Sequence, residues 1–477
     1  MTPEELLSER LDAADEAERD VRATDRLDDE NTLKKDYVRR VQAALEAGED
    51  ELVYNLVEPL HPADIADLFE LIDADERLAL SKAITDLMGG EVFAELNDHV
   101  RELLVESLPA GEVADIAEQL DTDDAVAMLE DLDEDDQQAV LAEMEPEDRA
   151  AIETALAFPE ESAGRLMSRD FVAVPEHMSV GDLIDFLREG RDLANEFWEV
   201  FIVDARHHPI GSCALSWILR TPRHIALTDV MTREQALIPV TMDQEEVALR
   251  FQKYALISAA VVDSDGRLVG QITVDDVVHI IQKEAGEDAL ALSGAGDGDI
   301  NEPIQLTIRT RLFWLFINLG TAILAAGVVG QFEAEIAKFA VLAVLMGIIS
   351  GMGGNAGTQT LAVVVRALAT NQLTDSNTVR MILRELTIAL ANGAVLGIAT
   401  GLGVALLYHN STLGWVMAAA MLINNLNAGL SGIMIPLTLD RFKIDPAVSS
   451  AVFVTMMTDV LGFFSFLGLA SLAGLAG

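Results

Sequence analysis

The last third of the chain alternates long apolar segments with short polar ones. Five segments cover about residues 311–330, 339–365, 386–408, 413–439 and 447–475. A helix needs roughly 20 predominantly apolar residues to cross the hydrocarbon core of a bilayer, and each segment reaches that length. The pattern therefore predicts five membrane-spanning helices.

Basic residues near the ends of these segments predict their orientation. Arg309 and Arg311 precede or begin the first segment, three arginines separate the second from the third, and Arg441 and Lys443 separate the fourth from the fifth. Membrane proteins keep an excess of such residues in their cytoplasmic loops. With an odd number of spans, the N-terminal part is expected in the cytoplasm and the C-terminus outside the cell.

The N-terminal part has a shorter period, which predicts a stack of short helices over about residues 36–158. An apolar residue followed by an acid recurs every twelve positions, in the series Leu120-Asp121, Leu132-Asp133 and Met144-Glu145, and Leu156 comes twelve positions later. Each unit has an acidic cap and a short amphipathic stretch. Repeated units of this kind pack against their neighbours, so we expect a superhelical scaffold.

A second duplication covers residues 166–285 and predicts two α/β modules of roughly 60 residues each. Residues 167–169 (Met-Ser-Arg) match 231–233 (Met-Thr-Arg), and Gly211 matches Gly270. Beyond the second module, residues 279–296 are expected to form an amphipathic helix followed by a flexible joint at the Gly-rich stretch 293–296.

Charge is divided unevenly between the two parts of the chain. The whole chain has 80 acidic and 32 basic residues, a net charge of −48. Residues 301–477 contain eight of each, so 72 acidic and 24 basic residues belong to residues 1–300. So anionic a surface repels phosphates, which excludes nucleic acid as a partner. It is typical of proteins from a salt-loaded cytoplasm, and some of the carboxylates are candidate ligands for divalent cations.

Several other classes are excluded or disfavoured. Cys213 is the single cysteine, which excludes an intrachain disulfide and fits a reducing compartment. The first 30 residues are acidic and lack an apolar run, so no signal peptide is predicted. No Ser-His-Asp, metal-hydrolase or Walker pattern is evident, and we do not expect an enzyme.

Asp459 lies in the middle of the last apolar segment, and no acidic residue is closer in sequence than Asp445. An ionised Asp near the centre of a bilayer costs about 2.5–3.5 kcal/mol, so such residues face a bundle interior or a water-filled path. Asp459 is therefore predicted to bind a cation. The alternative is a protonated or helix-capping Asp buried in a helix bundle.

Small and polar residues concentrate at 351–359 in the second apolar segment, where four glycines are interleaved with Asn, Thr and Gln. We expect these glycines to weaken the helix and to expose backbone carbonyls, which is tolerated at membrane depth only where the backbone is buried or lines a cavity. The fourth segment carries Asn424, Asn425 and Asn427.

The α/β pair resembles tandem CBS domains. In the second copy Gly270, Thr273 and Asp276 match the ribose-binding pattern of that family, whereas Ala214 and Trp217 occupy the Thr and Asp positions of the first copy. The resemblance implies an adenine nucleotide such as ATP, held by Thr273 and Asp276. The alternative is a degenerate pair that serves only dimerisation.

Three further motifs, together with the order of the segments, resemble the MgtE family of magnesium channels and transporters over about residues 36–475. The motifs are FPEESAGRLM at 158–167, GGNAGTQ at 353–359, and DPA at 445–447 with TDVLG at 458–462. The resemblance implies a homodimer with a pore on its two-fold axis. The residues that it places along the pore are Asp459, Asn355, Thr358 and Gln359.

The expected fold class is a multidomain membrane protein with an α-helical superhelical N-domain, a tandem CBS (α/β) pair, a connecting helix and a five-helix transmembrane domain. The predicted boundaries are 1–35 for an acidic segment that is an exposed helix or disordered, 36–165 for the N-domain, 166–228 and 229–278 for the two CBS copies, 279–304 for the connecting (plug) helix and 305–477 for the pore domain.

The resemblance also implies feedback, in which cytosolic Mg²⁺ bridges carboxylates and closes the pore. Acids at the family's sensing positions are Asp243, Glu245, Asp276, Glu284, Glu287 and Asp288, and Asp123, Asp124 and Asp445 are further candidates. The alternative for each is a merely solvated carboxylate. At three positions where the family has an acid, a carboxylate and a proline, this chain has Ala255, His279 and Gly347. These differences predict a sensor that responds at a different cytosolic Mg²⁺ concentration.

The function that we expect is a Mg²⁺-selective channel or transporter of the inner cell membrane, with Mg²⁺ as both substrate and regulator. Mg²⁺ prefers oxygen ligands in octahedral geometry and gives up water reluctantly, which suits a carboxylate pair with amides and carbonyls. Two alternatives stay open: transport of another divalent cation such as Co²⁺ or Mn²⁺, and a membrane-anchored CBS sensor that carries no ions. No partner beyond a second copy and membrane lipids is expected.

Overall fold

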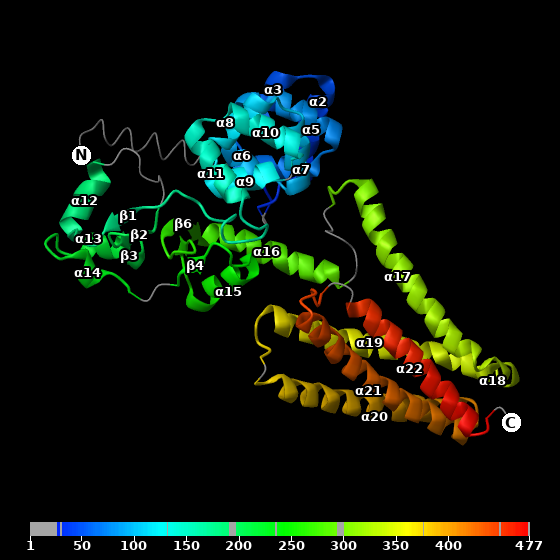
Figure 1. Cartoon of the computed structure of the whole chain (residues 1–477). Helices are drawn as coiled ribbons and strands as arrows, with labels where there is room; N and C mark the ends of the chain where they lie inside the picture. Colours follow the sequence, from blue (N-terminus) through cyan, green and yellow to red (C-terminus); the bar gives the residue numbers. More distant parts are fainter. Residues whose placement is uncertain are drawn as a thin grey trace, which may run out of the picture. The chain divides into compact units, whose positions relative to one another are not determined.

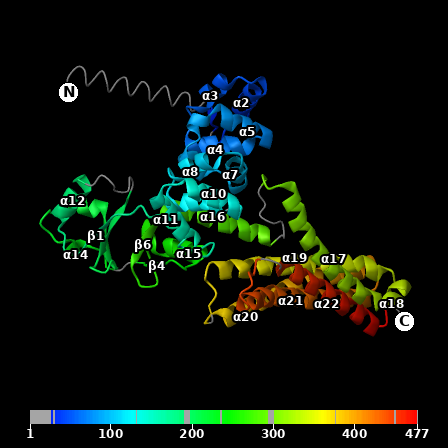
Figure 2. The same ribbon diagram turned by 45° about the horizontal axis from the view of Figure 1, so that its top comes forward.

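The computed structural model describes residues 26–28, 31–130, 132–189, 197–233, 236–292, 300–374, 376–447 and 450–475. The chain divides into two compact units, residues 1–281 and residues 282–477. Figure 1 shows the elements of both, and Figure 2 shows them after a rotation. Residues 1–25, 29 and 30 of the predicted acidic segment (1–35) and the predicted joint at 293–296 lie outside the described residues.

The first unit begins with short helices. They are α2 (Lys35–Ala47), α3 (Asp50–Val57), α4 (Pro62–Leu71), α5 (Ala74–Ala83), α6 (Gly90–Glu95), α7 (Asp98–Glu106), α8 (Ala110–Ala117), α9 (Thr122–Glu130), α10 (Glu134–Glu143) and α11 (Pro146–Leu156), with a 3-10 turn at Thr85–Leu87. The last three helices start twelve residues apart, as the sequence period predicts.

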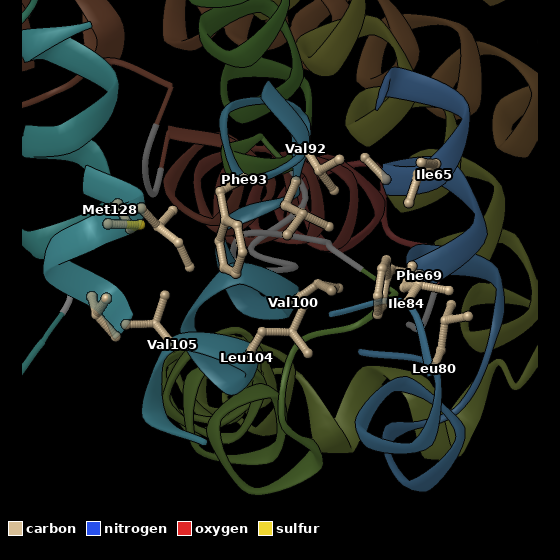
Figure 3. Close-up of a cluster of buried hydrophobic side chains, with 14 of the residues drawn as sticks. Ile65, Phe69, Leu80, Ile84, Val92, Phe93, Val100, Leu104, Val105 and Met128 are labelled. Carbon is tan, nitrogen blue, oxygen red and sulfur yellow. The ribbon is translucent and has the colours of Figure 1, made fainter. Parts of the chain in front are cut away.

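One apolar core joins these helices. Figure 3 shows side chains from α4 to α7 and from α9 gathered in a single cluster, with Phe69, Phe93 and Leu104 among them. All three are almost completely buried. Helix starts are fixed by polar caps, for example at α5, where Asp73 and Glu76 form a reciprocal capping box. The helical scaffold of the predicted fold class is confirmed.

Two small sheets follow, each of the same design. The strands are β1 (Ala173–Pro175), β2 (Glu199–Val203), β3 (Pro209–Ala214), β4 (Ile238–Pro239), β5 (Ser258–Val262) and β6 (Leu268–Thr273), and the helices are α12 (Val180–Glu189), α13 (Leu215–Arg220), α14 (Leu227–Val230), α15 (Gln244–Tyr254) and α16 (Val274–Ala291). In each sheet the first pair of strands is parallel and the second antiparallel. The buried Cys213 lies in β3.

Each module is preceded by a duplicated segment that packs against the other module. Met167, which precedes the first module, lies against Gly270 of the second, where an added Cβ would come within 2.8 Å of the Met167 Sδ. Met231, which precedes the second module, lies against Gly211 of the first, with a corresponding distance of 2.5 Å. Each glycine is therefore required by the close approach of the other copy's leading segment.

The second unit contains long apolar helices. They are α17 (Ile304–Gly330), α19 (Val341–Ala369), α20 (Thr378–Leu407), α21 (Ser411–Arg441) and α22 (Ser450–Leu472), with the short α18 (Glu333–Lys338) between the first two. Within the described ranges these five are long and apolar enough to cross a membrane, which confirms the transmembrane part of the predicted fold class. In both views α21 lies beside α20 and α22 (Figures 1 and 2).

The prediction that the glycines at 351–359 weaken the helix and expose its backbone carbonyls was wrong. Helix α19 runs without a break through 351–359. Two of the glycines are required by close packing instead, because an added Cβ at Gly353 would lie 2.1 Å from the Asn424 Nδ2 and one at Gly357 would lie 2.5 Å from the Val454 Cγ1. Neighbouring helices thus fill the space that the missing side chains leave, and the helical hydrogen bonds are kept.

Close backbone approach also joins α20 to α21. An added Cβ at Gly401 would lie 2.6 Å from the carbonyl oxygen of Gly414, and one at Gly397 would lie 2.7 Å from that of Ala418. By contrast, Gly403 has no neighbouring atom within 4 Å of such a Cβ. Small residues at regular helical spacing therefore bring these two helices together.

Candidate functional site

Asp459 lies on α22, and its side chain is half-buried. Its carboxylate Oδ1 accepts a hydrogen bond of 2.5 Å from the hydroxyl of Ser350 on α19. That length is at the short end of the range for O–H···O hydrogen bonds. The residues are 109 positions apart in sequence. Ser350 was not among the predicted site residues, although a polar side chain inside an apolar segment was a usable signal.

The other predicted pore residues, Asn355, Thr358 and Gln359, lie together on one exposed face of α19. Their spacing of three and four residues places them on adjacent turns of the helix. The hydroxyl of Thr358 donates to backbone carbonyls one turn earlier, those of Gly354 and Asn355. In a single chain the carboxylate of Asp459 is therefore bonded to Ser350, and the polar face of α19 is open.

Helix α21 is joined to α19 and α22 through amide side chains. The Asn424 Nδ2 donates to the carbonyl of Ile349 on α19, and the Asn427 Nδ2 donates to that of Met457 on α22, each at 2.9 Å. Asn424 is completely buried, and its Oδ1 has no donor among the described residues. Asn425 is equally buried but bonds within its own helix, to the carbonyl of Met421.

A second group of predicted residues meets in the first unit. Asp123 and Asp124 begin α9, Asp276 begins α16, and these three carboxylates interact electrostatically. Burial, followed by the negative charge of Asp276, raises the pKa of Asp124 to about 6. The same two causes raise the pKa of Asp123 well above its ordinary value. The Asp123 Oδ1 is buried, and no donor reaches it within the described part of the chain.

Two acids outside the predicted set belong to the same group. Burial and a hydrogen bond with Asp170, together with neighbouring charges, raise the pKa of Asp121 to about 6. Burial also raises the pKa of Asp276, although the hydrogen bond that the Thr273 hydroxyl donates to its Oδ2 acts in the opposite direction. We call Asp121, Asp123, Asp124, Asp170 and Asp276 the acidic group. A divalent cation would relieve the repulsion within it.

The remaining predicted sensing residues lie elsewhere. Asp243 caps α15 by accepting from the backbone nitrogen of Glu245, and Asp445 accepts from that of Ala447 ahead of α22. Glu284 and Glu287 are half-buried on α16, and the side chain of Asp288 is outside the described residues. Within the described ranges, no three His, Cys, Asp or Glu side chains stand in a ligating arrangement.

The α/β pair forms an open cavity of about 630 Å³. Its lining includes Trp198, Ala214 and Trp217 from the first module and Ile257 and Ser258 from the second. Thr273 and Asp276, the predicted nucleotide-binding residues, are not part of that lining. They bond to each other, and Asp276 belongs to the acidic group. The cavity therefore lies beside Ala214 and Trp217, in the copy that lacks the ribose-binding pattern, and away from Thr273 and Asp276.

Comparison with known proteins agrees with this architecture. A family model described as the divalent cation transporter MgtE matches residues 346–469, one for the MgtE intracellular N domain matches 60–161, and one for the CBS domain matches 227–283. The magnesium transporter MgtE of Enterococcus faecalis is 32% identical over 321 residues, which are 67% of this chain and 71% of that protein.

Two other relatives cover different shares of the chain. The magnesium transporter MgtE of Bacillus subtilis is 26% identical over 443 residues, 93% of this chain and 98% of that protein. A crystal structure of the cytosolic domain of the Mg²⁺ channel MgtE in complex with ATP covers 51% of this chain and 99% of its own, with 27% identity and a TM-score of 0.47.

Proposed function

Because this chain belongs to the MgtE family of divalent cation transporters, we propose that it carries Mg²⁺ across the cell membrane and that Asp459 binds the ion. The observation that supports the site is a carboxylate held among apolar helices by Ser350 of α19, the same helix that carries the exposed Asn355, Thr358 and Gln359. Oxygen ligands of this kind suit Mg²⁺, which is bound through one or two carboxylates while keeping several waters.

The ion site is completed by a second copy in this proposal. One carboxylate and one polar face leave the ion open on one side, and a two-fold axis next to α19 and α22 would supply the same groups again. Basic residues at Arg309, Arg366 and Arg441 support a cytoplasmic N-terminal part and an outside C-terminus. Chemical crosslinking in membranes tests the dimer, and protease access to sealed cells tests the orientation.

Ion uptake tests the transport proposal. Full-length protein produced in a host that lacks Mg²⁺ uptake should restore growth in low Mg²⁺, and Asp459→Asn should abolish the rescue because the carboxylate is lost. Asp440→Asn is the matched control, since Asp440 is an exposed acid near the end of α21. Rescue by Asp459→Asn at normal protein levels would contradict the site. Competition with Co²⁺ and Mn²⁺ distinguishes transport of another divalent cation.

We propose further that cytosolic Mg²⁺ regulates the flux by binding at the acidic group. The carboxylates of α9 and of the start of α16 come from separate parts of the first unit. The buried Asp123 Oδ1, which lacks a donor within the described part of the chain, supports the presence of a cation there. A bridging divalent cation would hold α9 against α16, and its loss would let the like charges separate them.

Recordings from excised membrane patches test this regulation. Mg²⁺ applied to the cytosolic face should reduce channel opening, and the double variant Asp123→Asn, Asp276→Asn should require a higher Mg²⁺ concentration for the same reduction. Asp135→Asn is the matched control because Asp135 is an exposed acid on α10. Equal Mg²⁺ sensitivity of the double variant and the wild type would place the sensor elsewhere.

A further inference from the structure

The hydrogen bond between Ser350 and Asp459 changes which oxygens of the carboxylate are available to an ion. Ser350 donates to Oδ1, while Oδ2 accepts no hydrogen bond within the described residues. A carboxylate oxygen that accepts a short hydrogen bond has less electron density to offer a cation. Asp459 therefore has one unengaged oxygen, Oδ2, while Oδ1 already uses one of its lone pairs and is the weaker ligand.

Two amides on α21 fix the level at which Ser350 meets Asp459. Asn424 bonds to the carbonyl of the residue before Ser350, and Asn427 bonds to the carbonyl two residues before Asp459. Asn424 is clamped between two glycines, because an added Cβ at Gly353 or at Gly462 would lie within 2.1 Å or 2.9 Å of its side chain. Sliding of α19 along α22 would break these bonds, so α21 sets their register.

Mg²⁺ and Ca²⁺ make different demands on such a site. Ca²⁺ takes six to eight oxygen ligands and often binds both oxygens of one carboxylate, whereas Mg²⁺ requires an octahedron and retains several of its waters. A carboxylate restricted to one oxygen satisfies Mg²⁺ and leaves Ca²⁺ short of ligands. Asp459 itself is a suitable ligand for both cations, so a distinction between them requires a group that restricts its carboxylate.

We propose that Ser350 determines the preference for Mg²⁺ over Ca²⁺ by occupying the Oδ1 of Asp459, and that Asn424 and Asn427 are positioning residues for this hydrogen bond. The proposal rests on the assignment of Asp459 as the ion site. It assigns a role in selectivity to a hydroxyl on α19 and a positioning role to the buried amide of Asn424, whose Nδ2 bonds across to α19.

Flux measurements on the full-length protein in lipid vesicles test the proposal. Mg²⁺ and Ca²⁺ uptake are measured separately, and the ratio of the two is compared between variants. Ser350→Ala should lower the Mg²⁺ to Ca²⁺ ratio by roughly tenfold, the factor expected for one charge-assisted hydrogen bond. Ser350→Thr keeps the hydroxyl and should retain a ratio near that of the wild type.

A matched pair of variants tests the positioning role of Asn424. Asn424→Ala should lower the ratio, whereas Asn425→Ala should not, because Asn425 is as deeply buried but bonds only within α21. An equal loss of Mg²⁺ and Ca²⁺ flux in Ser350→Ala would overturn the selectivity role, and equal ratios in Asn424→Ala and Asn425→Ala would overturn the positioning role.

Asp459→Asn separates this inference from the proposal on which it rests. Loss of both fluxes in Asp459→Asn together with an unchanged ratio in Ser350→Ala would refute the role of the serine alone. Normal fluxes in Asp459→Asn would refute the ion site and with it the role of Ser350.

Discussion

The guanidinium of Arg165 lies 2.5 Å from the carboxylate of Glu130, and this ion pair ties the segment after α11 to the end of α9. Arg165 also donates to the backbone carbonyls of Phe158 and Leu156. Its side chain is 13% exposed, so water replaces these bonds only in part when they are lost. Arg165 is thus the polar centre of the connection between the helical scaffold and the α/β pair.

Arg165→Ala should therefore destabilise the first unit by about 2–3 kcal/mol, because it removes charge-assisted hydrogen bonds and leaves two carbonyls without a donor. Thermal unfolding of the purified protein measures the effect. Arg39→Ala is the control, since the pair of Arg39 with Asp36 is 3.6 Å long and both side chains are largely exposed. Equal unfolding temperatures for the two variants would contradict the prediction.

Gly401→Ala should destabilise the contact between α20 and α21. The added methyl group would overlap the carbonyl oxygen of Gly414, and an overlap of this kind typically costs about 1–3 kcal/mol. Gly403→Ala, two residues away in open space, should be neutral or slightly stabilising because Ala is the better helix former. The fraction of detergent-solubilised protein that stays monodisperse after heating compares them, and the prediction fails if both variants match the wild type.

The raised pKa values in the acidic group predict an unusual dependence of stability on pH. The pKa values of Asp121 and Asp124 are raised to about 6 in the folded protein. An acid of this kind binds its proton more tightly when folded, so its contribution to folding stability is complete below its unfolded pKa and is lost as the pH rises from about 4 to about 6. Mg²⁺, in contrast, requires the ionised carboxylates.

Without divalent cations, the unfolding temperature of the first unit should be lower at about pH 7.5 than at about pH 5.5, and added Mg²⁺ should raise it more at the higher pH. Calorimetry with and without Mg²⁺ at both pH values measures this difference. Asp124→Asn should reduce the pH dependence and the Mg²⁺ effect together, while Asp135→Asn should leave both intact. A Mg²⁺ effect of the same size at both pH values would exclude these carboxylates as the binding site.

An adenine nucleotide, if added to the protein, is expected to enter the cavity between the two modules. The carboxylates around Asp276 repel phosphates, whereas Trp198 and Trp217 offer aromatic faces for a base. Trp217→Ala should weaken ATP binding and Thr273→Ala should not. Isothermal titration calorimetry distinguishes the two variants, and a loss of binding confined to Thr273→Ala would restore the site expected from the ribose-binding pattern.

The sequence predicts the architecture well because each element has a strong local signal. The five spans follow from apolar length, and the short helices follow from a twelve-residue period. Their ends are less predictable: α17 begins at Ile304 and α20 at Thr378, ahead of the apolar segments, because arginines at 309, 311, 380 and 384 end a hydropathy pattern without ending a helix.

The candidate site is predictable only in part. Asp459 is conspicuous because a charge among apolar residues is costly, but its partner Ser350 is a common residue on another helix, and only tertiary packing brings the two together. The prediction of a weakened helix at Gly353 and Gly357 was wrong because glycines destabilise an isolated helix. The sequence does not show that Asn424 and Val454 of neighbouring helices pack against these two positions. Likewise, 72 acidic residues give no local sign of which five will meet.

The position of Asp459 on the last of the five helices has a consequence for synthesis. Ser350 and the amides of α21 enter the membrane while the final helix is still to be made, so the groups that orient the carboxylate are in place before it arrives. A ribosome that stalls after α21 leaves a bundle without the Asp459 carboxylate. If Asp459 binds the ion as proposed, the site is complete only once α22 has packed against α19 and α21.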